Sequence, residues 1–257
     1  MWNRPQLMKD VADLLFTAGA AALLVAVVIG VARLPLFPIR EIVITNELRE
    51  VRRAEIERSL SGKLRGNFFS IDLEVLRESL EQLPWVRRAE MRRQWPASVE
   101  VRIEEHVPVA FWGRTNRQLV NSHGEIFTAG INAPSPEALP VLVGPTRFVS
   151  EMLGYYRQTV DLLRPIGRAP RVLTVSPRLA LQLKLDDGMI VELGREQVKA
   201  PASERPERLR RLERFVEFYP SILAVSEGRS EVVDMRYPNG FALRVAAAPE
   251  SEGEGTP

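Results

Sequence analysis

The residue types that most often carry chemistry are scarce in this sequence. Among its 257 residues there is no cysteine, which excludes disulfides, thiol nucleophiles, cysteine-based zinc sites and iron–sulfur clusters. The two histidines, His106 and His123, stand seventeen positions apart, without the spacing of a metal-binding motif. No Walker phosphate loop and no G-x-S-x-G elbow occurs. We therefore expect no catalytic residue, no metal site, no cofactor and no small-molecule substrate.

One cluster of basic and aromatic residues resembles what nucleic-acid binders use: Trp85, Arg87, Arg88, Arg92, Arg93 and Trp95. Two observations argue against that function. The net charge of the chain is only +2, and strand alternation would divide the arginines between two faces, with Arg87 and Arg93 on one of them. We interpret the cluster as a solvated strand face and expect no nucleic-acid partner.

Residues 14–32 form a stretch of nineteen residues without a charge, between Asp13 and Arg33. As a helix it would measure roughly 28 Å, close to the ~30 Å hydrocarbon core of a bilayer, and it has no polar face. We predict one transmembrane helix over 14–32, preceded by a short tail, 1–13. The alternative is a cleaved secretory signal, but the apolar run is longer than a signal's central region. The flanking positive charges nearly tie, so charge alone does not fix the orientation.

Residues 38–107 have the pattern of a small domain with mixed structure. Apolar alternation predicts strands over 39–45, 85–93 and 98–105, and helical periodicity predicts helices over 51–60 and 71–83. Ser70 is the candidate N-cap of the second helix, and Val99, Val101 and Ile103 should face the core. The order β-α-α-β-β predicts a three-stranded sheet with two helices on one face.

Residues 108–246 form a second predicted domain, made mostly of antiparallel strands with helical inserts. The pattern predicts a hairpin over 109–128 with its turn at Ser122–Gly124, a helix over 149–163, strands alternating from Leu179 to Leu193, a helix over 206–219 and strands over 231–236 and 241–245. The helix over 206–219 should have a solvated face made of Arg208, Arg210, Arg211, Glu213, Arg214 and Glu217. The acidic tail, 247–257, is predicted to be disordered. The expected fold class is α+β.

Several short motifs occur in an order that resembles one known family. They are FFSID at 68–72, LPWV at 83–86, RRQWP at 92–96, EEHVPVAFW at 104–112, LVNSHGEIF at 119–127, and VDMRY at 233–237 with Gly240 after it. Together they resemble the FtsQ/DivIB family of bacterial cell division proteins, in which a polypeptide-transport-associated (POTRA) domain precedes a β domain. The resemblance covers about residues 10–246, and its specificity lies in the order and spacing of the motifs.

The resemblance implies a bitopic protein of the bacterial inner membrane, located at the division septum, with residues 1–13 cytoplasmic and the bulk periplasmic. It implies a non-enzymatic scaffold of the divisome that links early and late division proteins. The implied partners are FtsB and FtsL in a ternary complex, with further divisome proteins contacting the POTRA domain and the membrane segment.

In the family that the sequence resembles, the closing strand of the β domain adds a strand from FtsB to its sheet edge. The positions that match this contact here are Arg236, Tyr237, Gly240, Phe241 and Leu243. Family members often carry an aromatic residue shortly after the last glycine. This chain instead has Leu243, Arg244 and Val245 there, and Phe241 is the candidate substitute.

Two other classes of protein stay open at the level of sequence. A membrane-anchored periplasmic enzyme would need a catalytic constellation, and none is recognisable. Another POTRA protein of transport or assembly would end in a β-barrel, but the region after Pro108 is short and carries two helical patterns. Co-purification with division proteins would separate the scaffold from both classes.

Overall fold

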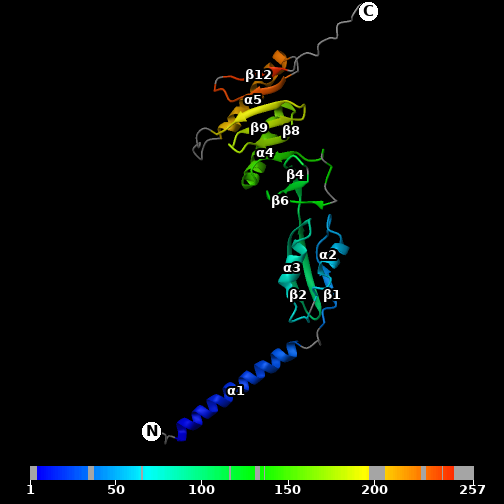
Figure 1. Cartoon of the computed structure of the whole chain (residues 1–257), viewed down its shortest axis with the longest axis vertical. Helices are drawn as coiled ribbons and strands as arrows, with labels where there is room; N and C mark the ends of the chain where they lie inside the picture. The colour runs from blue at the N-terminus through cyan, green and yellow to red at the C-terminus, as the bar shows by residue number, and fades with distance from the viewer. Residues whose placement is uncertain are drawn as a thin grey trace, which may run out of the picture. The chain divides into compact units, whose positions relative to one another are not determined.

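The computed structural model describes residues 5–33, 38–64, 66–115, 117–130, 134–135, 137–196, 206–226, 230–238 and 240–245. The chain divides into two compact units, Met1–Glu105 and His106–Pro257 (Figure 1). The tail predicted to be disordered, 247–257, lies outside the described residues.

The first element, helix α1 (Pro5–Arg33), is long and apolar enough to cross a membrane. Its apolar stretch, Met8–Val27, spans 20 residues, and large side chains such as Leu14 and Phe16 are exposed along it. Over this stretch apolar side chains surround the helix, and their surface is more stable in contact with lipid chains than with water. The helix begins before the predicted span at 14–32, so part of the predicted tail is helical as well.

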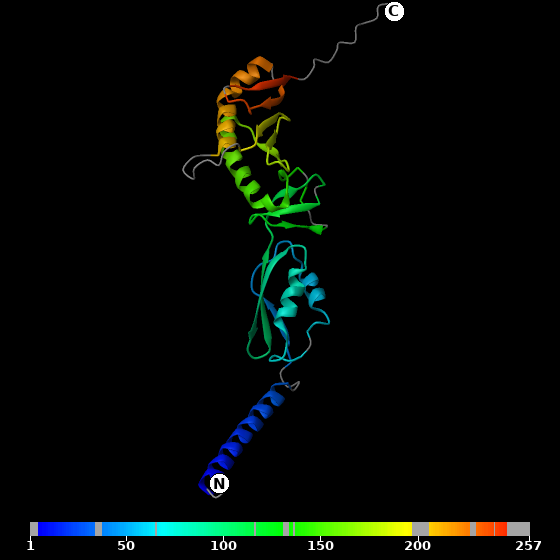
Figure 2. The same cartoon turned by 60° about the vertical axis from the view of Figure 1, so that its left-hand side comes forward.

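The rest of the first unit is a three-stranded sheet covered on one face by two helices (Figure 2). Its elements are β1 (Glu41–Ile44), α2 (Arg53–Leu60), α3 (Leu73–Glu81), β2 (Val86–Gln94) and β3 (Ser98–Glu105). The central strand, β3, is parallel to β1 and antiparallel to β2. Val99, Val101 and Ile103 are buried, as predicted, together with Ile56 and Leu60 of α2 and Leu76 and Leu80 of α3. The predicted β-α-α-β-β order is confirmed.

The start of α3 differs from the prediction. Asp72, and not Ser70, is the N-cap, because its Oδ1 accepts the backbone N–H groups of Glu74 (3.0 Å) and Val75 (3.3 Å). The helix begins two residues later than predicted, and the capping position moves with it. The Ser70 hydroxyl instead accepts the backbone N–H of Asn67 at 2.9 Å and closes the preceding turn.

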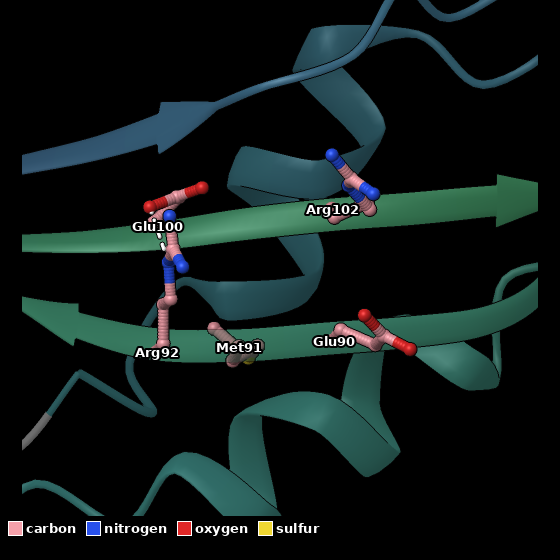
Figure 3. A pocket seen from close by; sticks show the side chains of 5 residues that line it. All are labelled: Glu90, Met91, Arg92, Glu100 and Arg102. Atoms are coloured by element: carbon pink, nitrogen blue, oxygen red, sulfur yellow. Dashed lines mark hydrogen bonds and ion pairs between the residues drawn. The ribbon is translucent and has the colours of Figure 1, made fainter.

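The face of this sheet away from the helices carries opposite charges in register (Figure 3). Arg92 of β2 donates to Glu100 of β3 at 2.5 Å, and Glu90 stands opposite Arg102. Arg93 lies on the helix side, where it donates to two loop carbonyl oxygens. Because each of these cations on the outer face stands against a carboxylate, that face offers no continuous positive surface to a phosphate backbone.

The second unit is built on a nine-stranded sheet with the order β12-β11-β10-β9-β8-β7-β4-β5-β6. The strands are β4 (Pro108–Trp112), β5 (Gln118–Asn121), β6 (Ile126–Phe127), β7 (Val141–Val143), β8 (Pro170–Val175), β9 (Leu181–Leu185), β10 (Ile190–Gly194), β11 (Ser230–Asp234) and β12 (Ala242–Val245). Among these described strands only β4–β7, β7–β8 and β10–β11 pair in parallel, so the sheet is mostly antiparallel, as predicted.

Two helices cover one face of this sheet (Figure 2). Helix α4 (Val149–Leu163), flanked by the short 3-10 helices η2 (Thr146–Phe148) and η3 (Arg164–Ile166), has the bounds that the sequence predicts. Helix α5 (Glu207–Ser226) carries the apolar stripe of the core, in which Leu212 and Phe215 are fully buried. The α+β fold class predicted for the chain is confirmed.

Several elements of the second unit differ from their prediction, and strands β7 and β8 were not predicted. The stretch 109–128 forms three strands and not one hairpin, and the turn at Ser122–Gly124 joins β5 to β6. Leu179, predicted in a strand, has a φ of 62° and lies in the turn before β9. Helix α5 continues through Pro220 past the predicted end at 219, and the added turns contain the fully buried Ile222. Burial of an isoleucine stabilises turns that a proline would otherwise disfavour.

Two charged residues of α5 also lie elsewhere than predicted: Arg208, whose side chain is 11% exposed, and Arg211. Arg211, assigned to the solvated face from its position in the sequence, is only 3% exposed. Its Nη1 donates to the carbonyl oxygens of Leu193 (2.6 Å) and Arg195 (3.1 Å), and its Nη2 pairs with Glu207. A guanidinium has five N–H donors and can satisfy several oxygens at once, so burial is compatible with its charge.

Candidate partner-binding edge

The last described strand, β12, forms one end of the nine-stranded sheet. It pairs antiparallel with β11, with Leu243 opposite Val233 and Ala242 opposite Asp234. No other strand of the described chain pairs with β12. Within the described ranges its outer side therefore presents unpaired backbone groups, which is the arrangement in which a sheet accepts an added strand.

The hydrogen-bond register shows which residue of β12 faces the open side. Met235 donates its N–H to the carbonyl oxygen of Glu192 in β10 at 3.0 Å, so the backbone of Asp234, one residue earlier, faces β12. Ala242, the partner of Asp234, accordingly turns its N–H and C=O toward β11. Leu243 follows Ala242 and turns its own N–H and C=O to the open edge.

Arg236 precedes β12 and forms an ion pair on the solvent side. Its guanidinium donates to Asp234, with Nη2 2.5 Å from Oδ2 and Nε 2.8 Å from Oδ1. This hydrogen bonding holds the pKa of Asp234 below its usual value and raises the pKa of Arg236. The Arg236 side chain is 60% exposed, so its outer N–H groups are accessible to a carboxylate or carbonyl oxygen of a partner.

The depressed pKa of Asp234 predicts that this ion pair is lost in acid. The carboxyl pKa is lower in the folded chain than the unfolded value of about 3.9, so the pair stabilises the fold above that pH. The stabilisation disappears as the pH falls through the folded pKa. An NMR titration of the Asp234 carboxyl should have a midpoint below that of a free aspartate, and Arg236→Ala should return the midpoint toward it. A normal midpoint in the native protein would contradict the ion pair.

Tyr237 lies in the turn that leads into β12 and is 55% exposed. The turn is held from α5, where Arg214 donates to the carbonyl oxygens of Tyr237 (3.3 Å) and Pro238. A Cβ added at Gly240 would meet no atom within 4 Å, so the space beside this residue, just before β12, is open. These two hydrogen bonds restrain the backbone at Tyr237 and Pro238, and the Tyr237 ring is presented to solvent.

Apolar side chains line the helix side of the edge. Phe241 and Leu243 are partly buried against the core, and the Phe241 ring lies 5.8 Å from the ring of Phe218 in α5. Phe218 is 39% exposed and Val225, seven residues further along α5, is 72% exposed. Residues seven apart share one flank of a helix. An added strand would place every second side chain on the same face of the sheet as Phe241 and Leu243.

The solvent side of the edge is an open, charged depression. Charged residues line it: Glu192, Asp234, Arg236 and Arg244. Within the described ranges, no three histidine, aspartate or glutamate side chains are grouped to hold a metal ion. One apolar and one charged flank along a strand edge suit a peptide segment with alternating side chains.

The structure brings all the predicted site residues to this one edge: Arg236, Tyr237, Gly240, Phe241 and Leu243. Sequence reasoning missed Arg214 and Phe218. These two are four residues apart on a helix that was itself predicted, so a shared flank could have been anticipated. Which flank meets the last strand depends on the packing of α5, which the sequence does not reveal.

Two family models match the chain. The one described as POTRA domain, FtsQ-type, matches residues 37–106, and the one described as cell division protein FtsQ/DivIB, C-terminal, matches residues 110–236. The second match ends at Arg236, so the predicted site residues from Tyr237 onward lie beyond it.

Curated relatives match along most of the chain. It is 38% identical over 249 residues to cell division protein FtsQ of Nitrosospira multiformis, covering 95% of this chain and 99% of the relative. It is 38% identical over 246 residues to FtsQ of Burkholderia pseudomallei, covering 96% and 95%. Against FtsQ of Escherichia coli the identity is 30% over 220 residues, covering 84% and 75%.

Fold and matches together define a POTRA protein with an apolar N-terminal helix and a second, β-rich unit. The chain belongs to the FtsQ/DivIB family of cell division proteins. This membership gives it a role in the divisome through protein–protein interactions, in a family of cell division scaffolds that is not a known enzyme family. With α1, the chain fits a single-pass membrane protein.

Proposed function

We propose that this chain is a non-enzymatic scaffold that binds FtsB and FtsL through its second unit, in part by adding a strand of FtsB to β12. The observation that carries the proposal is the open side of β12, toward which Leu243 turns its N–H and C=O. Backbone hydrogen bonds to those groups would supply affinity, and alternate side chains would supply specificity.

The side chains around the edge support distinct roles in this complex. Tyr237 offers a large exposed ring whose burial would stabilise the complex, and its hydroxyl is able to hydrogen-bond at the rim. Arg236 offers donors to an acidic group on the solvent side of the added strand. Phe241 and Leu243 would pack against apolar side chains on the helix side.

The proposal also includes the position of the protein in the cell. Residues 1–13 would be cytoplasmic, 14–32 would span the inner membrane, and the POTRA domain (38–107) and β domain (108–246) would be periplasmic at the septum. The POTRA domain and the membrane helix would contact other divisome proteins and so link early and late stages of division. Protease protection in spheroplasts would test this orientation, since a protected second unit would contradict it.

Truncating the exposed ring of Tyr237 tests the binding edge. Tyr237→Ala should weaken binding of FtsB to the full chain in detergent by roughly thirtyfold, or about 2 kcal/mol, as for a central aromatic residue of an interface. The unfolding temperature of the Tyr237→Ala chain should stay nearly unchanged, because the Tyr237 ring is largely exposed. Arg164→Ala, which removes another exposed side chain of the same unit, is the matched control. Equal affinity of Tyr237→Ala and Arg164→Ala would count against this edge.

A further inference from the structure

An exposed aromatic cluster marks one end of the POTRA sheet. Trp95, in the turn between β2 and β3, is 64% exposed, and Phe69 is 48% exposed. Both rings rest on the buried Phe68, with centroids 5.7 Å and 5.3 Å away in edge-to-face contact. We call Phe68, Phe69 and Trp95 the tip cluster. Single exposed apolar residues are common on proteins, but two large rings braced on a third form a defined apolar surface.

The tip cluster lies at the end of the sheet where the chain enters from α1. The backbone N–H of Arg40 donates to the carbonyl oxygen of Ala97 at 2.8 Å, in the same turn as Trp95, and Glu41 pairs with Ser98. Helix α1 ends at Arg33, so six residues, 34–39, separate its end from the residue that makes that hydrogen bond. The seven Cα–Cα steps from Arg33 to Arg40 span at most about 25 Å. This tether confines the turn to the vicinity of the membrane surface.

Positive charge accompanies the aromatic rings. Arg93 stands two residues before Trp95 and donates from Nε to the carbonyl oxygen of Phe68 (2.8 Å) and from Nη2 to that of Ile71 (2.7 Å). Both acceptors are carbonyl oxygens, so these two contacts do not pair the guanidinium with a carboxylate. Arg40 is exposed at the same turn. A tryptophan ring, an exposed phenylalanine and flanking arginines are a combination that proteins place at the bilayer interface.

We propose that Phe69 and Trp95 insert into the headgroup region of the bilayer that holds α1, and that Arg40 and Arg93 bind anionic phospholipid headgroups there. The contact fixes the POTRA domain on the membrane surface by its tip and limits the directions in which its other faces point. It needs only the membrane anchor and does not depend on the binding edge at β12. The bilayer is favoured as the occupant because the tether already holds the tip beside it, without a further partner.

The absence of native cysteine makes the contact measurable in the full chain. A single spin label is introduced by Gln94→Cys, at the exposed end of β2 next to Trp95, with the chain in nanodiscs containing phosphatidylglycerol. Glu47→Cys is the matched control. It is exposed beyond the far end of β1, roughly 17 Å further along the sheet. Immersion of each label in the bilayer is read from its collisions with two reagents. Oxygen is enriched in lipid, whereas a nickel complex is soluble only in water.

The label at Gln94→Cys should be shielded from the nickel complex and accessible to oxygen, whereas the label at Glu47→Cys should remain in water. Adding Phe69→Ser should return the Gln94→Cys label toward the aqueous value, and nanodiscs of phosphatidylcholine alone should weaken its shielding. Phe69→Ser is chosen because Phe69 is largely exposed, and Trp95→Leu, which retains apolar area, should keep most of the shielding. Equal aqueous exposure of both labels would overturn the proposal. So would shielding that appears only after division proteins are added, because the tip would then be a protein-binding surface.

Discussion

Leu243→Pro is expected to abolish strand addition at β12 while leaving β12 paired with β11. The N–H of Leu243 faces the open edge, so proline removes a donor needed by an added strand and no bond to β11. The proline ring would also stand in the path of the incoming backbone. Losing the backbone hydrogen bonds between β12 and the added strand should lower affinity for FtsB by ~100-fold, about 2.7 kcal/mol. Calorimetry on the full chain in detergent would measure this loss.

Ala242→Pro is the matched control for this prediction. Its N–H faces β11, so proline there removes a bond within the protein and should lower the unfolding temperature more than Leu243→Pro does. Leu243→Ala separates the backbone effect from the side chain, because it shortens a partly buried residue and keeps the N–H. If Leu243→Pro binds FtsB as tightly as the native chain, strand addition at this edge is wrong.

Local periodicity predicts the parts of the fold in which burial follows the sequence pattern. Strand β3 and helix α4 have the predicted bounds, since Val99, Val101 and Ile103 alternate into one core and α4 has a regular apolar face. The prediction fails where tertiary packing decides. Leu179 continues the alternation of β9 in sequence, yet the chain turns there with a positive φ. Helix α5 outlasts Pro220 because the core accepts Ile222.

The candidate site likewise has one part that the sequence predicts and another that depends on tertiary packing. Family motifs identify Arg236 and Tyr237, but a motif does not show whether a strand lies at the edge or the centre of a sheet. That depends on the pairing of β11 with β10 in parallel, a contact between segments about 40 residues apart. The contacts of Arg214 and Phe218 with the end of the chain likewise follow from how α5 packs. Non-local pairing therefore decides whether a recognisable motif lies at a sheet edge that could accept a strand.

Arg211→Ala should produce the largest loss of stability among the charged residues of α5. The side chain is buried and joins the carbonyl oxygens of Leu193 and Arg195 to the carboxylate of Glu207. Alanine would leave these oxygens unsatisfied in a site that water reaches poorly. Breaking a buried charged contact of this kind costs about 3–5 kcal/mol. Urea unfolding, with hydrogen exchange of β10 as a local probe, would measure the loss.

The same substitution should weaken the binding edge, because Arg211 lies next to the groups that form it. Gly194, with a φ of 70°, lets the two arginines approach: a Cβ there would lie 3.1 Å from Nη1 of Arg211 and 2.8 Å from Cγ of Arg236. Arg211 also lowers the pKa of Asp234, so its loss should raise that pKa. Arg210→Ala, which changes an exposed arginine one position away, should alter stability by less than about 1 kcal/mol. Similar losses for Arg210→Ala and Arg211→Ala would contradict the structural role of the buried guanidinium.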